Sequence, residues 1–532
     1  METILAIPSG QVIRLRRFIS DLPGYWLILI LGLLSATILL WGLGSASLYN
    51  WDEAIFAQVS KEILQTGDWI TMHYEYKTWI YRSPLLMWIM ALFYKLFGVT
   101  EFWSRAPSAF SGVGLVIITH LIGKSVYDKY TGFLAAVILL TSNQFVHSSR
   151  SGMTDVMLTF FIFLAIYAYL RLEEGNQAWW YLIWGSCALA VMTKTTAAFV
   201  SPAAITLALL LKGRLMAAIR SRQFWLGVLI AVAILAPWHI AMLIKHGHRF
   251  INDYFIFNTI GHMNAAVDGL TGGRFFYIER LQTEFHPWYY LLPFALALCV
   301  HENIVGQSRS RILLLVIVLV FGLYTLARTK LPWYIVPLYP PFAILTASLI
   351  TRAFRCYKSV SFSAVVVATA VVALAASRSM ALMLGGVMAC VFLLSLLMKR
   401  FAYELTAVVM CGFCVGVGLH EVRQLYVSGD APDAKVARLA HNADPGDREP
   451  LILYPTGRPG PTPRLWRPVF LFYSDRPIQE AYSLDDLAAF TGDHETKRIV
   501  LVKDEIESLP RSYEISIVAD DDPFVYATIK LN

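Results

Sequence analysis

Three carboxylates stand where the chain leaves or enters a long apolar run, which is where polar chemistry at a membrane surface would be placed. Asp52 and Glu53 lie side by side in Trp51-Asp52-Glu53-Ala54, directly after the first apolar run, and Asp155 precedes a later one. A positioned carboxylate can orient an acceptor hydroxyl and take its proton. We therefore take Asp52 and Asp155 as candidate catalytic residues and Glu53 as a candidate for substrate binding.

Basic side chains and one tyrosine follow in other segments between apolar runs. Lysine and arginine make strong charge-assisted hydrogen bonds to phosphate, and histidine and tyrosine can add further donors. We expect these side chains to come together with the carboxylates on one face and to hold a phosphate group there. The set on this face is Arg82, Lys194, His246, His248, His262, Arg274, His286, Arg328, Lys330 and Tyr334. From it we take Arg82, Lys194, His262, Lys330 and Tyr334 as candidates for binding the phosphate.

Each of these residues also has a purely structural interpretation. An acidic residue in the first turn of a helix, such as Asp52, is stabilised by the helix dipole by about 0.3–1 kcal/mol. Asp155 is placed to cap the helix that follows it, and long basic side chains at span ends can snorkel to the interface. Only a shared location in the folded chain would separate the two interpretations.

The element that must position Asp52 is a helix between Asn50 and Gly67. Asn50 is a good N-cap, Glu53 completes a capping-box pattern, and Gly67 is a natural C-terminal stop. An apolar stripe runs along one side of this helix, and polar residues occupy the rest of it. The pattern predicts an amphipathic helix on the membrane surface. The stripe is Ile55, Phe56, Val59 and Ile63, and the polar residues are Gln58, Lys61, Glu62 and Gln65.

The composition is that of a membrane protein. Of 532 residues, 57% are hydrophobic and 15% are charged, whereas a soluble domain has about 25% charged residues. The net charge of +7 comes from short loops between apolar runs and does not indicate nucleic-acid binding.

Apolar runs long enough to cross or nearly cross a bilayer occur about thirteen times, so we expect a polytopic α-helical membrane protein. The run 85–97 is shorter and predicts a re-entrant or surface helix. The expected spans are 24–43, 106–124, 132–146, 155–171, 179–193, 196–211, 224–243, 287–301, 311–327, 333–350, 360–376, 380–398 and 404–419.

The orientation follows from the basic residues in the short loops, which favour the cytoplasm. Six basic loops fall on one side if thirteen spans are right, so we expect that side, with the N-terminus, to be cytoplasmic. These loops carry Arg14 to Arg17, Lys124 to Lys129, Lys212 to Arg222, Arg309 to Arg311, Arg352 to Lys358, and Lys399 to Arg400. The opposite side then receives the loops 44–105 and 245–286 and the segment after about residue 420.

That last segment differs in composition and predicts a separate domain. We expect a transmembrane domain over residues 1–420 and a small periplasmic α/β domain over 421–532. Pro/Gly-rich stretches alternate there with strand-like runs at 451–454, 469–472 and 498–502. The six cysteines lie in spans or in a cytoplasmic loop, so we expect no structural disulfide. We expect no cofactor, and the pair His246 and His248 is only a weak signal for a divalent metal.

Short motifs spread over residues 45–350 resemble, in order, those of the polyprenyl-phosphate-sugar-dependent glycosyltransferases. This GT-C-fold family includes the bacterial lipid A aminoarabinose transferases and the related protein O-mannosyltransferases. Each motif is short, but the set is specific. The motifs are Trp51-Asp52-Glu53-Ala54, Gly67-Asp68-Trp69, Ser83-Pro84-Leu85, Gly152-Met153-Thr154-Asp155, Met192-Thr193-Lys194, Ala236-Pro237-Trp238, Thr329-Lys330-Leu331-Pro332-Trp333-Tyr334-Ile335-Val336-Pro337 and Pro340-Pro341.

The resemblance implies a GT-C glycosyltransferase of the bacterial inner membrane, with its site on the periplasmic side, that inverts the anomeric carbon and uses no nucleotide sugar. It implies a polyprenyl-phosphate sugar as donor and lipid A, lipopolysaccharide or another envelope glycan as acceptor. By position, Asp52 and Asp155 match the family's acidic residues. Lys194, Lys330 and Tyr334 match positions around the donor phosphate.

The chain departs from the aminoarabinose transferases at several positions, which leaves the sugar and the acceptor open. Ile55 stands where they have an arginine, Arg82-Ser83 replaces their Glu-Lys, and His262 falls near an arginine of the family. Two other functions remain as alternatives: a protein O-glycosyltransferase, and a transporter or flippase of a lipid-linked sugar. No inverted repeat supports the transporter.

Overall fold

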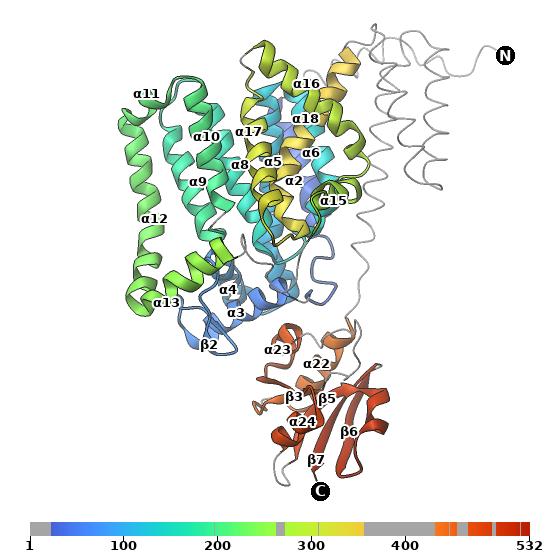
Figure 1. The fold of residues 1–532 in the computed structure, drawn as a ribbon. Helices are drawn as coiled ribbons and strands as arrows, with labels where there is room; N and C mark the ends of the chain where they lie inside the picture. The colour runs from blue at the N-terminus through green and yellow to red at the C-terminus, as the bar shows by residue number, and fades with distance from the viewer. Residues whose placement is uncertain are drawn as a thin grey trace, which may run out of the picture.

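A computed structural model describes residues 23–49, 51–195, 197–261, 272–306, 308–355, 431–445, 447–454, 467–491, 496–521 and 523–531. The predicted spans 360–376, 380–398 and 404–419, the N-cap Asn50 and the candidate His262 lie outside these residues. Figure 1 shows a helical bundle with a small domain of strands and helices beneath it.

Within the described residues, five helical segments are long and apolar enough to cross a membrane, and six shorter apolar helices accompany them. The chain is therefore a multi-pass helical membrane protein. The five segments are Glu101–Val126, Thr154–Leu172, Arg222–His246, Trp288–Val305 and Pro332–Arg352. The six shorter helices are Gly24–Leu40, Leu85–Phe97, Lys129–Leu140, Trp179–Thr193, Ala197–Leu211 and Arg311–Leu326.

Each of the ten predicted spans that fall in the described residues contains a helix. The run 132–146 is interrupted at Thr141 and Ser142. The run 333–350 begins with a 3-10 turn because Pro332 and Pro337 remove backbone donors there. The helices are α2 (Gly24–Leu40), α5 (Glu101–Val126), α6 (Lys129–Leu140), α7 (Asn143–Ser149), α8 (Thr154–Leu172), α9 (Trp179–Thr193), η1 (Ala197–Phe199), α10 (Val200–Leu211), α11 (Leu215–Ile219), α12 (Arg222–His246), η4 (Trp288–Leu291), α16 (Leu292–Val305), α17 (Arg311–Leu326), η5 (Pro332–Leu338) and α18 (Tyr339–Arg355).

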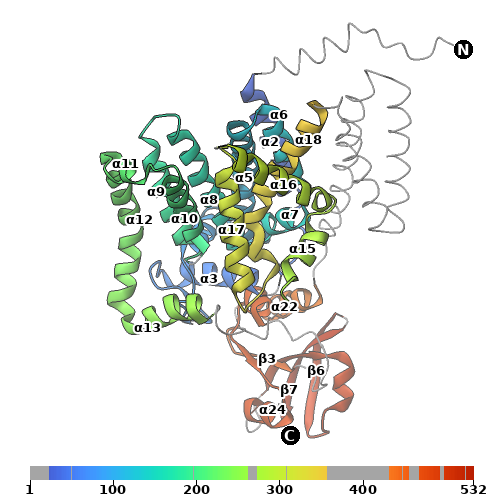
Figure 2. The same ribbon diagram turned by 45° about the horizontal axis from the view of Figure 1, so that its top comes forward.

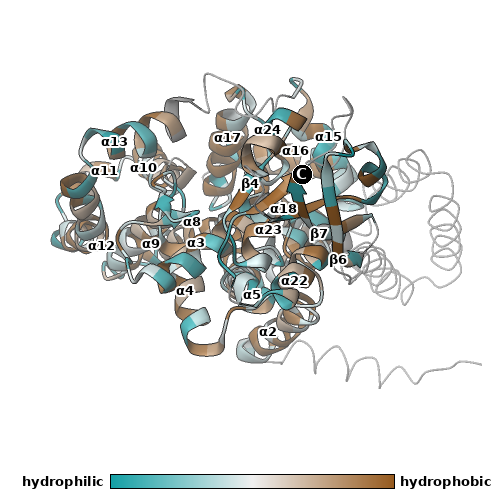
Figure 3. Ribbon diagram, turned by 90° about the horizontal axis from the view of Figure 1, so that it is seen from below, coloured by the Kyte–Doolittle hydropathy of each residue, from teal (hydrophilic) through white to brown (hydrophobic). Residues whose placement is uncertain are grey.

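The chain segments that the sequence assigns to the outer side gather at one end of the bundle, with the strands and helices of the C-terminal part (Figures 1 and 2). Helix α11 lies at the opposite end. Seen from the first end, hydrophilic residues surround α3 among hydrophobic helices (Figure 3). The outer segments are α3 (Asp52–Thr66), β1 (His73–Tyr74), β2 (Lys77–Thr78), α4 (Leu85–Phe97), α13 (His248–Phe250), the π-helical η2 (Ile251–Gly261) and α15 (Phe276–Glu284).

The helix predicted after Asn50 is confirmed as α3, and it ends at Gly67, whose φ of 71° is left-handed. Its polar side, which an amphipathic surface helix would leave open, is buried at two positions. Gln58 and Glu62 are 2% and 0% exposed, and Gln58 donates to Glu62. The backbone N–H groups of two residues in the β1–β2 turn also donate to Glu62. Gln58 and Glu62 are therefore covered by protein, whereas Gln65 near the end of the helix is exposed.

The C-terminal residues 431–531, which we call the sheet domain, contain a five-stranded mixed sheet with strand order β4-β3-β5-β7-β6. Strand β3 is parallel to both β4 and β5, and β7 is antiparallel to β5 and β6. The strands are β3 (Leu451–Tyr454), β4 (Ile478–Glu480), β5 (Lys497–Val502), β6 (Tyr513–Asp521) and β7 (Phe524–Leu531). The helices are α22 (Pro432–Ala443), α23 (Arg467–Ser474) and α24 (Leu484–Thr491).

Helices cover both faces of this sheet, because successive strand residues point to opposite sides. Leu451 and Leu453 pack with α22 and α23 on one face. Ile452 packs with Leu487 of α24 on the other face. Both faces are apolar, as expected for strands buried between helix layers.

The strand expected at 469–472 is wrong, because these residues form the middle of α23. Phe470 and Leu471 of this helix face the sheet, while Val469 and Phe472 face α3. A helix buried on two sides reads as a continuous apolar run, which periodicity alone does not distinguish from a buried strand.

Helices α5 and α6 approach closely through two glycines, as is common where helices pack in membranes. A Cβ at Gly132 would lie 2.3 Å from the carbonyl oxygen of His120, and one at Gly123 would lie 2.7 Å from the Cα of Gly132.

We expect Gly132→Ala to force the helices apart and to destabilise the protein by about 1–3 kcal/mol, as overpacking does. Thermal unfolding in detergent measures the change. Gly32→Ala in α2 is the control, because its Cβ would meet nothing within 4 Å; equal stability of the two variants would contradict the expectation.

Candidate functional site

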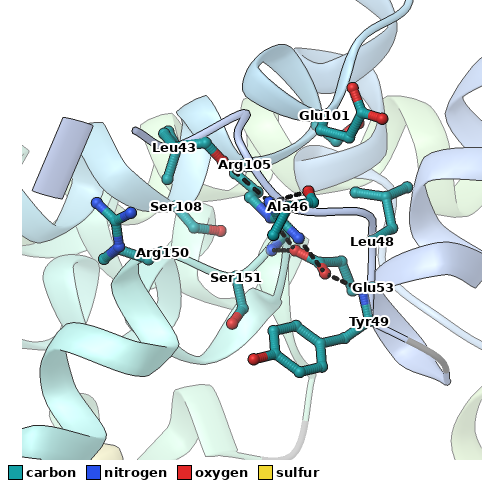
Figure 4. A network of polar contacts seen from close by, with 12 residues as sticks. Leu43, Ala46, Leu48, Tyr49, Glu53, Glu101, Arg105, Ser108, Arg150 and Ser151 are labelled. Atoms are coloured by element: carbon teal, nitrogen blue, oxygen red, sulfur yellow. Dashed lines mark hydrogen bonds and ion pairs between the residues drawn. The ribbon is translucent and has the colours of Figure 1, made fainter. Parts of the chain in front are cut away.

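A buried ion pair between Glu53 of α3 and Arg105 of α5 lies at the end of the bundle that carries α3 (Figure 4). The two side chains are 1% and 4% exposed. Arg105 Nε donates to Glu53 Oε1 at 2.8 Å, and Nη2 donates to Oε2 at 3.1 Å. This two-point contact is the geometry in which a guanidinium binds a carboxylate most specifically.

The remaining donors of Arg105 hold the loop that leads to Asp52. Its Nη1 donates to the carbonyl oxygens of Leu43 and Ala46, at 2.9 and 2.8 Å, and its Nη2 donates to that of Ser47 at 2.8 Å. All five N–H groups of the guanidinium thus have an acceptor. The loop between α2 and α3 is built around this one side chain.

The carboxylate of Glu53 also receives two backbone N–H groups. Tyr49 donates to Oε2 at 2.6 Å, and Gly152 donates to Oε1 at 2.7 Å. Gly152 lies three residues before Asp155, and a Cβ there would lie 2.9 Å from the carbonyl oxygen of Ser104. Glu53 therefore fixes the start of α3 and the start of α8 at once. These are the two positions that carry Asp52 and Asp155.

Arg105 and Glu53 have roles that differ from those expected from the sequence. We expected Glu53 to contact substrate, but it is buried and its contacts are structural. Arg105 was missed because it directly precedes an apolar run. Its position was the available signal, since it is a basic residue on the side opposite to the six basic loops.

Four of the predicted site residues come together with Asp52 next to the ion pair. Lys194 Nζ lies 2.8 Å from Asp155 Oδ1 and 4.7 Å from the centre of the Tyr334 ring. The charges of Asp52 and Arg82 act on the Asp155 carboxylate and on the Tyr334 hydroxyl. The five residues come from α3, the segment before α4, α8, the end of α9 and η5.

The two carboxylates of this cluster differ in environment. Asp155 is 3% exposed and paired with Lys194, whereas Asp52 is half-buried at the first turn of α3. A paired carboxylate orients its partner, whereas a more accessible one can receive a proton. This difference makes Asp52 the better candidate for a base and Asp155 the better candidate for holding Lys194.

Ser83, beside Arg82, connects three segments of the chain around the cluster. Its hydroxyl bonds the carbonyl oxygen of Val191 at 2.7 Å, the Tyr254 hydroxyl at 2.8 Å and the Thr195 hydroxyl at 3.2 Å. Ser83 therefore joins the segment before α4 to η2 and to the end of α9. It holds the backbone between Arg82 and Lys194 and brings no charge of its own.

Lys330 does not join the cluster at its ammonium group. Its Nζ donates to the carbonyl oxygens of Tyr324, Thr325 and Ala327, at 3.2, 2.8 and 3.0 Å. A lysine in this position satisfies the free carbonyls at the end of α17 and neutralises the helix dipole. Burial lowers the pKa of Lys330. The structure therefore gives Lys330 a helix-capping role in place of the expected contact with a phosphate.

Arg150 caps α2 in the same way, through the carbonyl oxygens of Ile38, Leu39 and Trp41. The weak metal signal is also accounted for by local contacts. His246 Nε2 lies 2.9 Å from Thr71 Oγ1. Among the described residues, no group of three or more His, Cys, Asp and Glu side chains is placed to hold a metal ion.

The chain matches two groups of known sequences. Residues 81–240 match the family model of the dolichyl-phosphate-mannose-protein mannosyltransferases. An undecaprenyl phosphate-α-4-amino-4-deoxy-L-arabinose arabinosyl transferase of Pseudomonas savastanoi pv. phaseolicola is 28% identical over 335 residues, which is 58% of each chain. An uncharacterised protein of Aquifex aeolicus is 28% identical over 314 residues, 58% of this chain and 61% of that one. The matched region thus spans about three fifths of these relatives.

The fold is shared over almost the whole chain. The structure of ArnT from Cupriavidus metallidurans bound to undecaprenyl phosphate superposes with a TM-score of 0.73, at 18% identity, over 94% of this chain and 97% of that one. The apo oligosaccharyltransferase of Archaeoglobus fulgidus superposes with a TM-score of 0.53 at 11% identity, over 91% of this chain and 70% of that one.

These likenesses define the class: the protein has the GT-C fold of membrane glycosyltransferases. The resemblance seen in the motifs is confirmed. Within that class the chain is similar to the bacterial aminoarabinose transferases in sequence and in fold.

The ion pair of Glu53 with Arg105 predicts a dependence of stability on pH. Burial raises the pKa of Glu53, but Arg105 and the two backbone N–H groups outweigh it, so the pKa is lowered overall. The ionised carboxylate therefore stabilises the fold above its ordinary pKa of about 4.3, and this contribution is lost as pH falls through the lower folded-state value. Near pH 7 we expect Glu53→Gln to cost about 3–5 kcal/mol, because it leaves Arg105 buried without a counter-charge.

Thermal unfolding of both proteins in detergent between about pH 3 and pH 7 measures this effect, because the window in which the contribution is lost lies below the ordinary pKa. The advantage of the wild type over Glu53→Gln is expected to shrink below about pH 4.3, the ordinary pKa. Glu449→Gln, at an exposed position before β3, is the control and is expected to change neither curve. A gap between wild type and Glu53→Gln that grows as pH falls would contradict the assignment.

Proposed function

We propose that the protein is a glycosyltransferase that moves a sugar from a polyprenyl phosphate to an acceptor at the periplasmic face of the inner membrane. The observation that carries the proposal is the meeting of Asp52 and Asp155 with Arg82, Lys194 and Tyr334 at one end of a GT-C fold. This cluster pairs a candidate base with groups that hold an anion.

The chemistry assigns a role to each group. Asp52 receives the proton of the acceptor hydroxyl, whose oxygen forms a bond to the anomeric carbon of the sugar. The bond between that carbon and the phosphate oxygen breaks, and the polyprenyl phosphate leaves with one more negative charge. Lys194 and Arg82 stabilise that charge, and Tyr334 contributes its hydroxyl. Asp155 orients Lys194 through their 2.8 Å contact.

The matched proteins support a lipid-linked donor. One relative is named as using undecaprenyl phosphate-linked aminoarabinose, and the solved ArnT structure holds undecaprenyl phosphate. For the acceptor we favour lipid A, lipopolysaccharide or another envelope glycan. The family model that matches residues 81–240 is named for protein mannosyltransferases, so a protein acceptor is the alternative to test.

The direct test is a transfer assay with purified full-length protein in detergent and defined polyprenyl-phosphate sugars. Mass spectrometry of lipids and proteins from cells with and without the gene identifies the acceptor. Release of polyprenyl phosphate together with a glycosylated product is expected. A transporter would turn over no donor without a sealed compartment, so a complete lack of turnover with every donor would contradict the proposal.

Asp52→Asn is expected to lower the rate of transfer by about 10²–10⁴-fold, which is the rate enhancement that a positioned general base typically contributes. Asparagine keeps the size and much of the hydrogen bonding, so expression and thermal stability are expected to hold. Asp128→Asn is a matched control, because Asp128 caps the start of α6 through the N–H groups of Tyr130 and Thr131. Normal turnover by Asp52→Asn on the true acceptor would remove the catalytic role.

The periplasmic placement of the site and of the sheet domain predicts the outcome of reporter fusions. A reporter fused after Ser221, ahead of α12, is expected on the cytoplasmic side, and one fused at about residue 430 is expected on the periplasmic side. The reason is the excess of basic residues in the short loops at the Ser221 end. Alkaline phosphatase and green fluorescent protein fusions read the two sides. The same side for both fusions would mean that the number of spans between them is even.

A further inference from the structure

The loop before Asp52 has no regular secondary structure, so other parts of the chain must determine where Asp52 lies. Residues 41–49 join α2 to α3, and the next described residue, Trp51, has φ 83° and ψ −137°. A tryptophan in the left-handed half of the backbone map persists only where its surroundings hold it. The conformation of this loop therefore depends on contacts from outside it.

One set of contacts comes from the bundle, where Arg105 of α5 binds three carbonyl oxygens of the loop. A second set comes from the sheet domain. The N–H of Leu48, which is 2% exposed, donates to the hydroxyl of Tyr473 at 2.9 Å. The N–H of Ala431 donates to Ser47 Oγ at 3.0 Å.

Tyr473 connects this second set to the same turn of α5. Its hydroxyl donates to Glu101 Oε1 at 3.0 Å, and Glu101 lies one turn before Arg105. Arg438 of α22 pairs with Glu101, and its guanidinium lies 4.5 Å from the centre of the Tyr473 ring. The loop is thus held between Arg105 on one side and Tyr473 on the other. Arg105 is part of α5, and Tyr473 is bonded to Glu101 one turn earlier in the same helix.

The sheet domain continues this contact along α3. An apolar cluster joins Leu48, Ala54 and Ala57 to Ala434, Val469 and Phe472. At the far end, Lys61 pairs with Asp475 at 2.8 Å and donates to the carbonyl oxygen of Phe472 at 3.1 Å. The sheet domain therefore docks on the side of α3 that carries Ala54, Ala57 and Lys61, with α23 next to α3 (Figure 1).

We infer that Tyr473 is a positioning residue of the candidate site, through which the sheet domain holds the loop 41–49 and keeps Asp52 in place. The effect on activity rests on the proposed function, whereas the ordering of the loop does not. Tyr473 acts through Leu48 and touches none of the residues assigned to the donor phosphate.

The test is Tyr473→Phe in the full-length protein, which keeps the ring and removes the hydroxyl that accepts from Leu48. Misplacement of a catalytic group by about 1 Å can cost about 10²-fold in rate, so we expect kcat to fall by about 10- to 100-fold. The KM for the donor is expected to stay the same, because Arg82 and Lys194 come from segments that Tyr473 does not contact. A lower affinity for the donor with unchanged kcat would overturn the inference.

The matched control is Tyr526→Phe, which removes a hydroxyl from the same domain, where it donates to Asp444 Oδ2 at 2.6 Å. Tyr526 lies in β7, within the domain, and its loss weakens the domain without releasing the loop. We expect this variant to keep its kcat. An equal fall in kcat for both variants would show that only the stability of the domain matters and would overturn the inference.

Hydrogen–deuterium exchange of the peptide that covers residues 43–49 tests the clamp without any activity. We expect faster exchange in Tyr473→Phe than in the wild type or Tyr526→Phe, because the buried N–H of Leu48 loses its acceptor. Equal exchange in all three proteins would overturn the clamp. If the wild type transfers no sugar, the proposed function fails, and this measurement still decides whether Tyr473 holds the loop.

Discussion

The arrangement of the candidate site depends on the buried ion pair of Glu53 with Arg105. Removing two charges from water is costly, and the cost is recovered only when the geometry is good and the remaining polar atoms are satisfied. Both conditions are met here, since the guanidinium has an acceptor for each N–H and the carboxylate accepts two backbone N–H groups as well. Through these bonds one ion pair sets the relative positions of α3, α5 and α8.

The basic residues at this end of the bundle make two different kinds of contact. Lys330 and Arg150 bind carbonyl oxygens at the ends of α17 and α2, so their charges are used within the fold. Lys194 lies beside Asp155 and Tyr334, in a cluster that Arg82 and Asp52 also face. In this cluster Lys194 is paired with Asp155 at 2.8 Å. The two cations and two carboxylates balance in charge, so the cluster as a whole is neutral when all four are ionised.

Several positions at which the resemblance implies a difference from the aminoarabinose transferases have defined surroundings in this structure. The hydroxyl of Ser83 joins Val191, Thr195 and Tyr254. The charge of Arg82 acts on Asp155 and on the Tyr334 hydroxyl. Ile55 packs against an apolar cluster of α3 and α4. Only Arg82 of these three adds a charge near Asp155, so it is the difference with the most direct bearing on the cluster.

From the sequence alone, the apolar runs determined that the chain is a multi-pass helical membrane protein, because spanning a bilayer demands long uncharged segments. The short motifs around Asp52, Asp155 and Lys194 were enough to predict the fold family, and Gly67 marked the end of α3 correctly. Tertiary structure alone decided how the side chains are used. A lysine that caps a helix and a lysine that pairs with a carboxylate look alike in a sequence. The sequence pattern therefore did not distinguish the role of Lys330 from that of Lys194. Likewise, Glu53, Gln58 and Glu62 look like a solvated face of a helix, and only packing against α5, the β1–β2 turn and the sheet domain buries that face. Burial of a polar residue depends on partners that are distant in the chain. The local alternation of apolar and polar residues along a helix does not identify those partners.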